Sequence, residues 1–317
     1  MKIDEEVLPM KKFIKICTCA LVLSALLSGC QRDYYGKGLP FEMSTSKLPG
    51  YSNATISSMS ADNYERFMNA SYIRIVDKFG VLQKIKISPN IPRHSWDFSK
   101  LDDSGTFKNY VEDDGSVKRV GIDVSEHQGG IDWETVSKHV DFAFVRLGYR
   151  GYSNGNIVTD ARYTDNMTGA IEHGVPVGVY FYSQAITYEE GVEEANYVLS
   201  QLGDYALSYP IVLDREDPMQ ESARTNNLTK EQHTQAAMGF LETIKAAGRS
   251  AMVYTNQTYY AFYLDLEQIY HYPVWYAQYA NEPIWPYEFS IWQYSESGEV
   301  PGISGPVDMN IQMMPIE

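Results

Sequence analysis

Two acidic residues end an apolar, strand-like run in the second half of the chain. Residues 211–217 read Ile-Val-Leu-Asp-Arg-Glu-Asp, which places Asp214 and Glu216 one residue apart. Alternate side chains of a strand share a face, so these two carboxyl groups should point the same way. Each then raises the energy of the other's ionised form. A proton donor beside an anionic partner is the arrangement that glycoside hydrolysis requires.

An isolated Asp-x-Glu is more often a strand end that turns into solvent, so the pair needs support from elsewhere in the chain. Asp123 lies in the segment Gly-Ile-Asp-Val-Ser at 121–125, and Asp308 lies in Val-Asp-Met-Asn at 307–310. Both again stand at the ends of apolar, strand-like runs. Because parallel strands of a barrel converge on one mouth, the pattern predicts that the four carboxylates meet there.

The segments around these acids resemble the family 25 glycoside hydrolases, the lysozymes that cut peptidoglycan. The resemblance spans residues 121–317, and its matching segments are Gly121–Ser125 with Gln128 and Ile131–Trp133, Gly178–Tyr180, Asp214/Glu216, Trp275-x-Ala277-x-Tyr279, Trp292–Tyr294 and Val300–Asn310. It implies that Glu216 is the general acid that protonates the glycosidic oxygen. Asp214 would stabilise the substrate's N-acetyl group as this group attacks the anomeric carbon, with direct nucleophilic or water-activating roles left open.

The remaining candidates are expected to bind or tune rather than to react. Asp123 and Asp308 are assigned to charge tuning, sugar hydroxyl contacts or water positioning, with a purely structural role at a strand end as the alternative. The substrate-binding candidates share a place in or beside the matching segments: Tyr180, Tyr182, Gln128, Trp275, Tyr279, Gln293 and Tyr294, with Trp292 as a further aromatic. Strand alternation sends neighbours to opposite faces, so at least half of the aromatics should belong to the core.

From residue 119 to 317, strand and helix signals alternate, which indicates a parallel sheet. Strands are predicted over 142–147 and 175–182, with a helix over 164–172 between them that ends at Gly174. Thr187 with Glu190, and Thr229 with Gln232, predict two further helix starts. Later strands over 274–277, 289–292 and 307–308 follow with short connections. The fold class is therefore α/β, a modified (β/α) barrel with few helices between its last strands.

The first residues carry an export signal. Three lysines precede an apolar stretch over 16–27, which is too short to span a bilayer and suits a signal peptide. Leu-Ser-Gly-Cys at 27–30 resembles the bacterial lipobox, which predicts a lipoprotein signal over 1–29 and a membrane anchor on Cys30. An ordinary secretory signal with an incidental cysteine is the alternative. Residues 30–60 are predicted to be a flexible tether, so the protein should be an anchored lipoprotein of the bacterial cell envelope.

Residues 61–118 fall outside the family resemblance. Ile73 and Ile75 alternate with polar residues, as do Ile85 and Ile87 after a break, which predicts a β-hairpin. A second hairpin is predicted from the run 107–112, the turn Asp-Asp-Gly at 113–115 and the run from Val117 to 122. We expect a small β extension packed on the enzyme.

Composition narrows the function further. The chain of 317 residues holds 41 acidic and 26 basic side chains, and its net charge of -15 argues against a nucleic-acid partner. No His-x-x-x-His pair occurs, so no metal site is expected, and no cofactor is expected either. The partners are peptidoglycan strands and a membrane, and the protein should be a monomer. Two alternatives stay open: a chitinase-like N-acetylglucosaminidase of family 18, against which Val212 counts, and an inactive peptidoglycan-binding lipoprotein.

Overall fold

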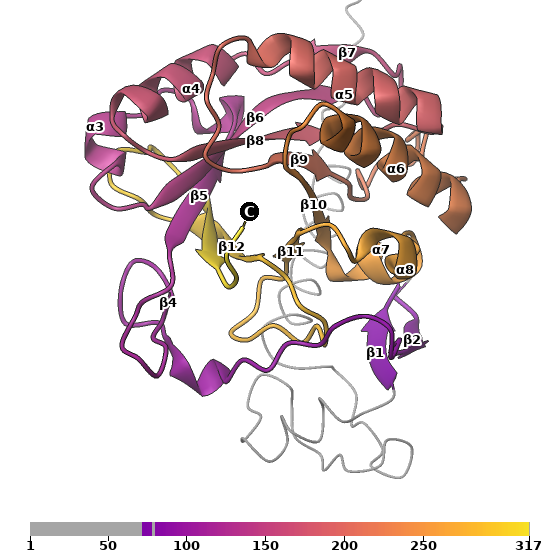
Figure 1. Cartoon of the computed structure of the whole chain (residues 1–317), viewed down its shortest axis with the longest axis horizontal. Coiled ribbons are helices and arrows are strands. Elements are labelled where there is room, and N and C mark those ends of the chain that lie inside the picture. Colours follow the sequence, from indigo (N-terminus) through magenta and orange to yellow (C-terminus); the bar gives the residue numbers. More distant parts are fainter. Residues whose placement is uncertain (1–71, 78–79, 317) are drawn as a thin grey trace, which may run out of the picture.

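Eight strands close into a barrel in the computed structural model, which describes residues 72–77 and 80–316 (Figure 1). Neighbouring strands run around the ring in the order β5-β13-β12-β11-β10-β9-β8-β6, and pairing of β6 with β5 closes it. A short strand, β7 (Ile157–Thr159), pairs with β6 outside the ring. The barrel strands are β5 (Val120–Val124), β6 (Phe142–Arg150), β8 (Val177–Tyr182), β9 (Ile211–Asp214), β10 (Ala251–Asn256), β11 (Val274–Ala277), β12 (Ile291–Gly298) and β13 (Val307–Gln312).

One barrel strand runs against the others. β13 is antiparallel to both β12 and β5, whereas the other neighbouring pairs of the ring are parallel. Asp308 is therefore at the start of its strand, not at the end that the sequence pattern suggested. Because the strand is reversed, its start still lies at the carboxyl ends of the parallel strands, and Asp308 pairs with Asp123 of β5.

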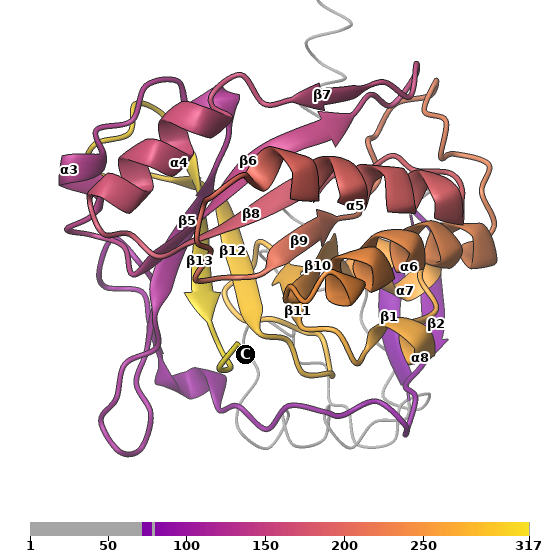
Figure 2. The same cartoon turned by 45° about the horizontal axis from the view of Figure 1, so that its top comes forward.

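Helices cover the early strands and are short or missing beside the late ones (Figure 2). The short α3 (Trp133–Val136), then α4 (Tyr163–Glu172), α5 (Tyr188–Leu202) and α6 (Lys230–Ala246), lie between β5 and β10 in the chain. Beyond β10 come only α7 (Gln257–Phe262) and α8 (Leu266–Ile269), and no helix follows in residues 270–316. The predicted modified barrel is confirmed. In the described part of the chain, none of the helices has the length and apolar character needed to cross a membrane.

The two predicted helix starts differ in their side-chain contacts. Thr229 and Gln232 form a complete capping box at α6, as predicted. Thr187 accepts a hydrogen bond from the backbone N–H of Glu190 at α5, but the Glu190 carboxylate does not return to Thr187. It accepts instead from the N–H of Ile186 and from Arg224. An ion pair thus takes the place of half of the expected box.

The core has an inner and an outer layer, separated by the barrel wall. Alternating side chains of the strands fill the inside at the end away from the mouth, among them Phe142, Phe144, Val212, Met252, Trp275 and Ile291. The intervening side chains point outward into a larger apolar layer beneath the helices. Two consecutive residues of one strand therefore belong to different layers.

The N-terminal extension contains both predicted hairpins, the second in a short form. Strands β1 (Tyr72–Val76) and β2 (Leu82–Lys86) pair antiparallel, as the alternating isoleucines indicated. The second hairpin turns at 113–115 as predicted: a bridge joins Val111 to Val117, and the N–H of Glu112 donates to the backbone oxygen of Ser116. It is shorter than predicted, and β4 (Asn109–Tyr110) also pairs with the earlier β3 (Leu101–Asp102). Tyr110 is buried, and its hydroxyl accepts from the N–H of Asp97, just before the 3-10 turn η3 (Phe98–Lys100).

This extension covers the late strands that lack helices. It runs along the lower side of the barrel from the β1–β2 hairpin to β4 (Figure 1). Trp96 packs against Phe289 with ring centroids 4.7 Å apart, and the ring of Phe98 lies 6.3 Å from that of Trp292. Its aromatic side chains therefore bury surface that a helix would cover in a regular barrel.

We expect Phe98→Ala to lower the free energy of unfolding by about 3–5 kcal/mol, because it leaves a cavity where a buried ring packs on the barrel. Val117→Ala, at an exposed position of the same extension, should change it by less than about 0.5 kcal/mol. Chemical denaturation followed by tryptophan fluorescence measures both. A loss below about 1 kcal/mol for Phe98→Ala would contradict the view that the extension is part of the barrel core.

Candidate active site

The structure brings the four predicted acids together at the mouth of the barrel. Asp214 ends β9, and Glu216 follows two residues later. Asp123 lies in β5, opposite Asp308 of β13. Asp123 and Asp214 are buried, whereas Glu216 and Asp308 are half-buried. Each acid is close enough to at least one other for their charges to interact.

Asp123 is held by two amide side chains. Gln293 and Asn310 each donate a hydrogen bond to its Oδ2, from Nε2 at 2.9 Å and from Nδ2 at 2.8 Å. The Oδ1 of Asn310 in turn accepts from the indole N–H of Trp275 at 2.7 Å. These donors offset part of the cost of burying a carboxylate, so Asp123 is fixed in a single orientation.

Two tyrosines complete this network from the other side. Tyr254 and Tyr279 both donate to the Oε1 of Gln293, at 2.8 and 3.0 Å. Gln293 therefore accepts with its oxygen and donates with its nitrogen, which fixes the orientation of the amide group. Burial is the largest cause of the raised pKa of each phenol, and nearby carboxylates add to it. Both tyrosines stay protonated donors.

The pair across the β5–β13 ladder shares a proton. Burial raises the pKa of Asp123 to about 6, although its amide donors oppose the shift. Burial, followed by the negative charge of Asp123, raises the pKa of Asp308 to about 9. Asp308 is then protonated at neutral pH and donates to Asp123, while Asp123 carries the charge.

The pair on β9 differs in its hydrogen bonds. Burial is the main cause that raises the pKa of Glu216 to about 7, and a hydrogen bond from Asn256 opposes the shift. Burial, and then the charge of Glu216, raise the pKa of Asp214 well above its usual range. The Oδ1 of Asp214 is buried and has no hydrogen-bond partner among the residues that the structure describes. An unpartnered buried oxygen at an active-site mouth invites a donor from a bound molecule.

Tyr180 and Tyr182 leave β8 on the face that these acids occupy. Tyr182 pairs in register with Asp214, and Tyr180 packs edge-on against Trp275 with ring centroids 6.1 Å apart. Burial and the negative charges of the acids raise the pKa of both phenols, so both remain donors. Their positions agree with the predicted contact to substrate, which stays a prediction.

Three of the predicted substrate-binding residues contact other parts of the protein, and their role in substrate binding stays a prediction. The amide of Gln128 accepts from the N–H of Ser125 and donates to the backbone oxygen of Pro306, which closes a local turn. Trp275 is buried inside the barrel, where its N–H positions Asn310. Tyr294 lies on the outer face of β12 beside Trp292, because its neighbour Gln293 points inward.

Three residues of the site were not singled out from the sequence. Asn310 is two positions after Asp308, so strand alternation places it on the same face. Tyr254 and Asn256 share a face of β10 by the same alternation. The same rule of strand alternation that identified Asp214 and Glu216 applies to each of these residues. The missing information was which late strands pair across the barrel.

The described residues contain no group of three or more His, Cys, Asp or Glu side chains arranged to hold a metal ion. A closed barrel with four carboxyl groups of raised pKa at its mouth, two of them at and just beyond the end of one strand, has the parts of a glycoside hydrolase. Comparison with known proteins agrees. Residues 122–303 match the glycosyl hydrolases family 25, and the chain belongs to that family. It is a glycoside hydrolase.

Two curated relatives and one solved structure illustrate the likeness. Lysozyme M1 of Streptomyces globisporus is 29% identical over 209 residues, which cover 60% of this chain and 66% of the relative. The autolytic lysozyme of Clostridium acetobutylicum is 27% identical over 191 residues, 60% of this chain and 54% of the relative. The lysozyme structure from Streptomyces coelicolor superimposes with a TM-score of 0.51 at 27% identity, over 62% and 93% of the two chains.

Proposed function

We propose that this protein is a lysozyme, which hydrolyses the β-1,4 bond between N-acetylmuramic acid and N-acetylglucosamine in peptidoglycan. Glu216 protonates the leaving oxygen, and Asp214 stabilises the positive charge that develops as the N-acetyl group attacks the anomeric carbon. The observation that carries the proposal is the pair itself: Glu216 is half-buried, two residues from a buried Asp214 oxygen that lacks a partner among the described residues. Burial raises the pKa of Glu216 to about 7. Lysozyme relatives support the choice of substrate.

Substrate binding decides which carboxyl group of the pair keeps the proton. In the empty site, burial favours the protonated form of both groups. An amide N–H of the sugar that donates to the Oδ1 of Asp214 favours the ionised form of Asp214. Since two close negative charges repel, Glu216 then holds its proton more firmly. The substrate thus prepares its own general acid, and the acetamido group is the part that does so.

The surrounding residues support this chemistry. Asp123, fixed by Gln293 and Asn310, adds a negative charge that raises the pKa of Glu216. Protonated Asp308 holds Asp123 in place. Tyr180 and Tyr182 present phenol donors to the acetamido group or to the sugar ring. No step in this scheme uses a metal or a cofactor.

Digestion of purified peptidoglycan by residues 31–317, with mass spectrometry of the new reducing ends, tests the proposal. Muramic acid at the new ends is the expected result. Glucosamine ends would identify a glucosaminidase instead. Binding to the wall without any new ends would identify a peptidoglycan-binding protein that has kept the fold but lost the chemistry.

We also propose that the mature protein is a lipoprotein, anchored through Cys30 and joined to the barrel by the tether over 30–60. These segments lie outside the described residues, so the support is the Leu-Ser-Gly-Cys sequence after a short apolar stretch. The wild-type protein should fractionate with membranes, and Cys30→Ala should release it or stop its processing. Immunoblots of membrane and soluble fractions measure this. Unchanged processing and retention of Cys30→Ala would refute the anchor.

A further inference from the structure

The sheet holds the two carboxyl groups of the pair unequally. Asp214 pairs in register with Tyr182 of β8 and with Tyr254 of β10, so strands on both sides fix its backbone. Glu216 lies two residues beyond the end of β9, outside these ladders. A displacement of about 1 Å can cost a catalytic group roughly 100-fold in rate. Contacts other than the barrel ladders must therefore fix the position of Glu216.

Arg215, between the two acids, supplies such contacts. It points away from the barrel mouth by strand alternation and is 1% exposed. Its guanidinium donates to the backbone oxygen of Ala185 at 2.7 Å and to Oγ of Ser183 at 3.2 Å. Both residues belong to the β8–α5 loop, residues 183–187. Its Nη2 also lies 3.3 Å from Nδ1 of His233 in α6. Within the described residues, no carboxylate forms a direct ion pair with Arg215, and the oxygens of Ala185 and Ser183 in the loop are its nearest partners.

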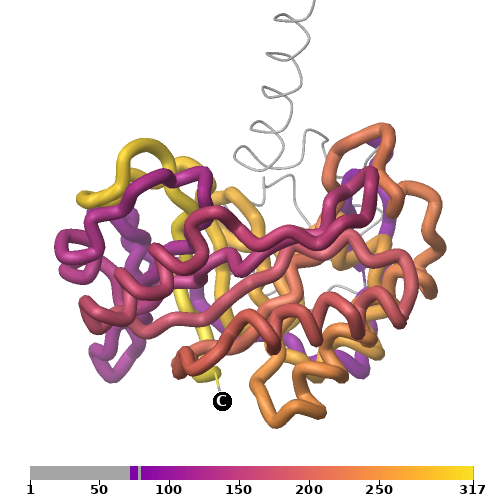
Figure 3. The backbone as a smooth tube through the Cα atoms, turned by 90° about the horizontal axis from the view of Figure 1, so that it is seen from above, coloured from indigo at the N-terminus to yellow at the C-terminus, as the bar shows by residue number. Residues whose placement is uncertain are grey.

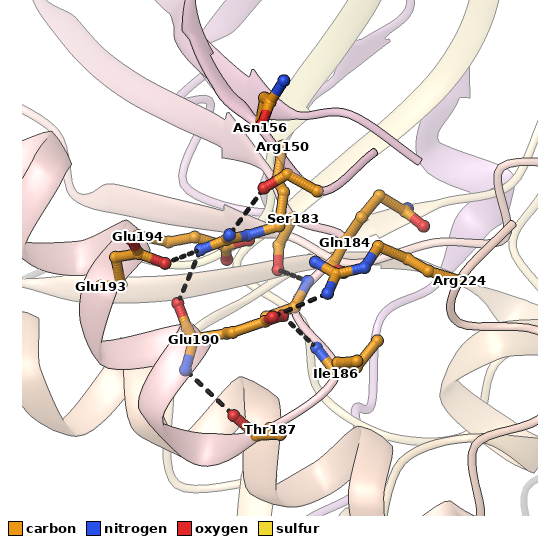
Figure 4. Close-up of polar contacts among 12 residues, drawn as sticks. Arg150, Asn156, Ser183, Gln184, Ile186, Thr187, Glu190, Glu193, Glu194 and Arg224 are labelled. Atoms are coloured by element: carbon orange, nitrogen blue, oxygen red, sulfur yellow. Dashed lines mark hydrogen bonds and ion pairs between the residues drawn. The ribbon is translucent and has the colours of Figure 1, made fainter. Parts of the chain in front are cut away.

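A buried ion network fixes the β8–α5 loop from behind (Figure 4). Glu194 of α5 is fully buried and accepts from the Ser183 side chain and from Nε of Arg150, the latter at 2.7 Å. Arg150 also pairs with Glu193 at 2.7 Å. Burial raises the pKa of Glu194, and the positive charges of Arg150 and Arg215 oppose that rise. Breaking such a network is costly, which makes the loop a rigid support.

The same loop also holds the chain beyond Glu216. The Glu190 carboxylate accepts from the N–H of Ile186 at 2.9 Å and from Nη2 of Arg224 at 2.7 Å. Thr225 donates to Oε1 of Gln184 at 3.0 Å. The segment 216–223 is therefore anchored to one loop at both of its ends, by Arg215 before it and by Arg224 and Thr225 after it.

We infer that Arg215 is a positioning residue, which places the carboxyl group of Glu216 for proton transfer by clamping the end of β9 to the β8–α5 loop; the inference rests on the function proposed above. Arg215 does not touch substrate. Its contribution is the geometry of the acid, so its loss should resemble a partial loss of the acid and leave binding nearly unchanged. Asp214, held by two strands, should keep its place.

Steady-state kinetics of Arg215→Met on two substrates test this. On soluble peptidoglycan fragments, kcat should fall roughly 10- to 100-fold while KM changes by less than about threefold. On a para-nitrophenyl glycoside of N-acetylmuramic acid, whose leaving group needs little protonation, the loss should be under about threefold. Arg215→Lys should recover part of the activity on fragments, because an ammonium can still donate to Ala185. Arg249→Met, the same change at an exposed position beside the start of β10, should leave kcat unchanged.

Thermal unfolding of each variant shows whether a loss of activity comes from lower stability or from a displaced Glu216. Rates are therefore compared well below the lowest melting temperature of the set. If Arg215→Met does not fold, Arg215→Lys keeps the buried charge and carries the same two-substrate comparison. Wild-type kcat in a folded variant, or an equal loss on both substrates, overturns the inference. Glu216→Gln shows whether a failed prediction concerns the acid or only Arg215. If Glu216→Gln retains full turnover, Glu216 is not the general acid. If Glu216→Gln is inactive while Arg215→Met is fully active, only the positioning role of Arg215 is rejected.

Discussion

Glu216→Gln should lower turnover on peptidoglycan by about two to four powers of ten, with little change in binding. Glutamine keeps the length of the side chain and can still meet Asn256, but it has no proton to give. The wild-type kcat/KM should fall as pH rises through about 7, because the acid acts in its protonated form and burial raises its pKa in the empty site to about that value. The residual activity of Glu216→Gln should lack this alkaline loss.

The para-nitrophenyl glycoside provides the control for this prediction. Its leaving group departs with little protonation, so Glu216→Gln should regain most of its rate on that substrate. Reducing-end assays on peptidoglycan fragments and absorbance assays on the aryl glycoside measure the two rates on the same preparation. Full activity of Glu216→Gln on peptidoglycan would mean that another group is the acid.

Asp214→Asn should cripple turnover on both substrates, by about two to four powers of ten on peptidoglycan. The substitution removes the anion that stabilises the developing positive charge of the transition state. A good leaving group does not replace the lost negative charge. It also takes away the negative neighbour that helps Glu216 to stay protonated. The loss on the aryl glycoside therefore separates Asp214 from Glu216, although both variants look alike on the natural substrate.

The double variant should lose less than the product of the two single losses, because the residues act as a unit. Circular dichroism at a fixed temperature confirms that each variant is folded before its rate is compared. If the aryl glycoside restores the activity of Asp214→Asn but not that of Glu216→Gln, then Asp214 is the general acid and Glu216 is the stabilising carboxylate.

Much of the fold could be predicted because its signals are local. Helix α6 begins at a capping box that four residues define, and the β1–β2 hairpin follows from alternation within fifteen residues. The second hairpin forms around its predicted turn, but the pairing of β4 with the earlier β3 was not predicted, because tertiary contacts decide the partner of a strand. The reversal of β13 was missed for the same reason: the direction of a strand is set by its partners.

Sequence alone determined which acids could act together, since an Asp-x-Glu at a strand end places both side chains on one face through backbone geometry. It also determined the family, through short segments that match in order. Only the tertiary structure decided that Gln293 and Asn310 hold Asp123, that Tyr294 faces outward, and that Arg215 clamps the end of β9 to a neighbouring loop. These contacts join residues from about 30 to about 190 positions apart, and their energies depend on burial and charge, which arise only when the barrel closes.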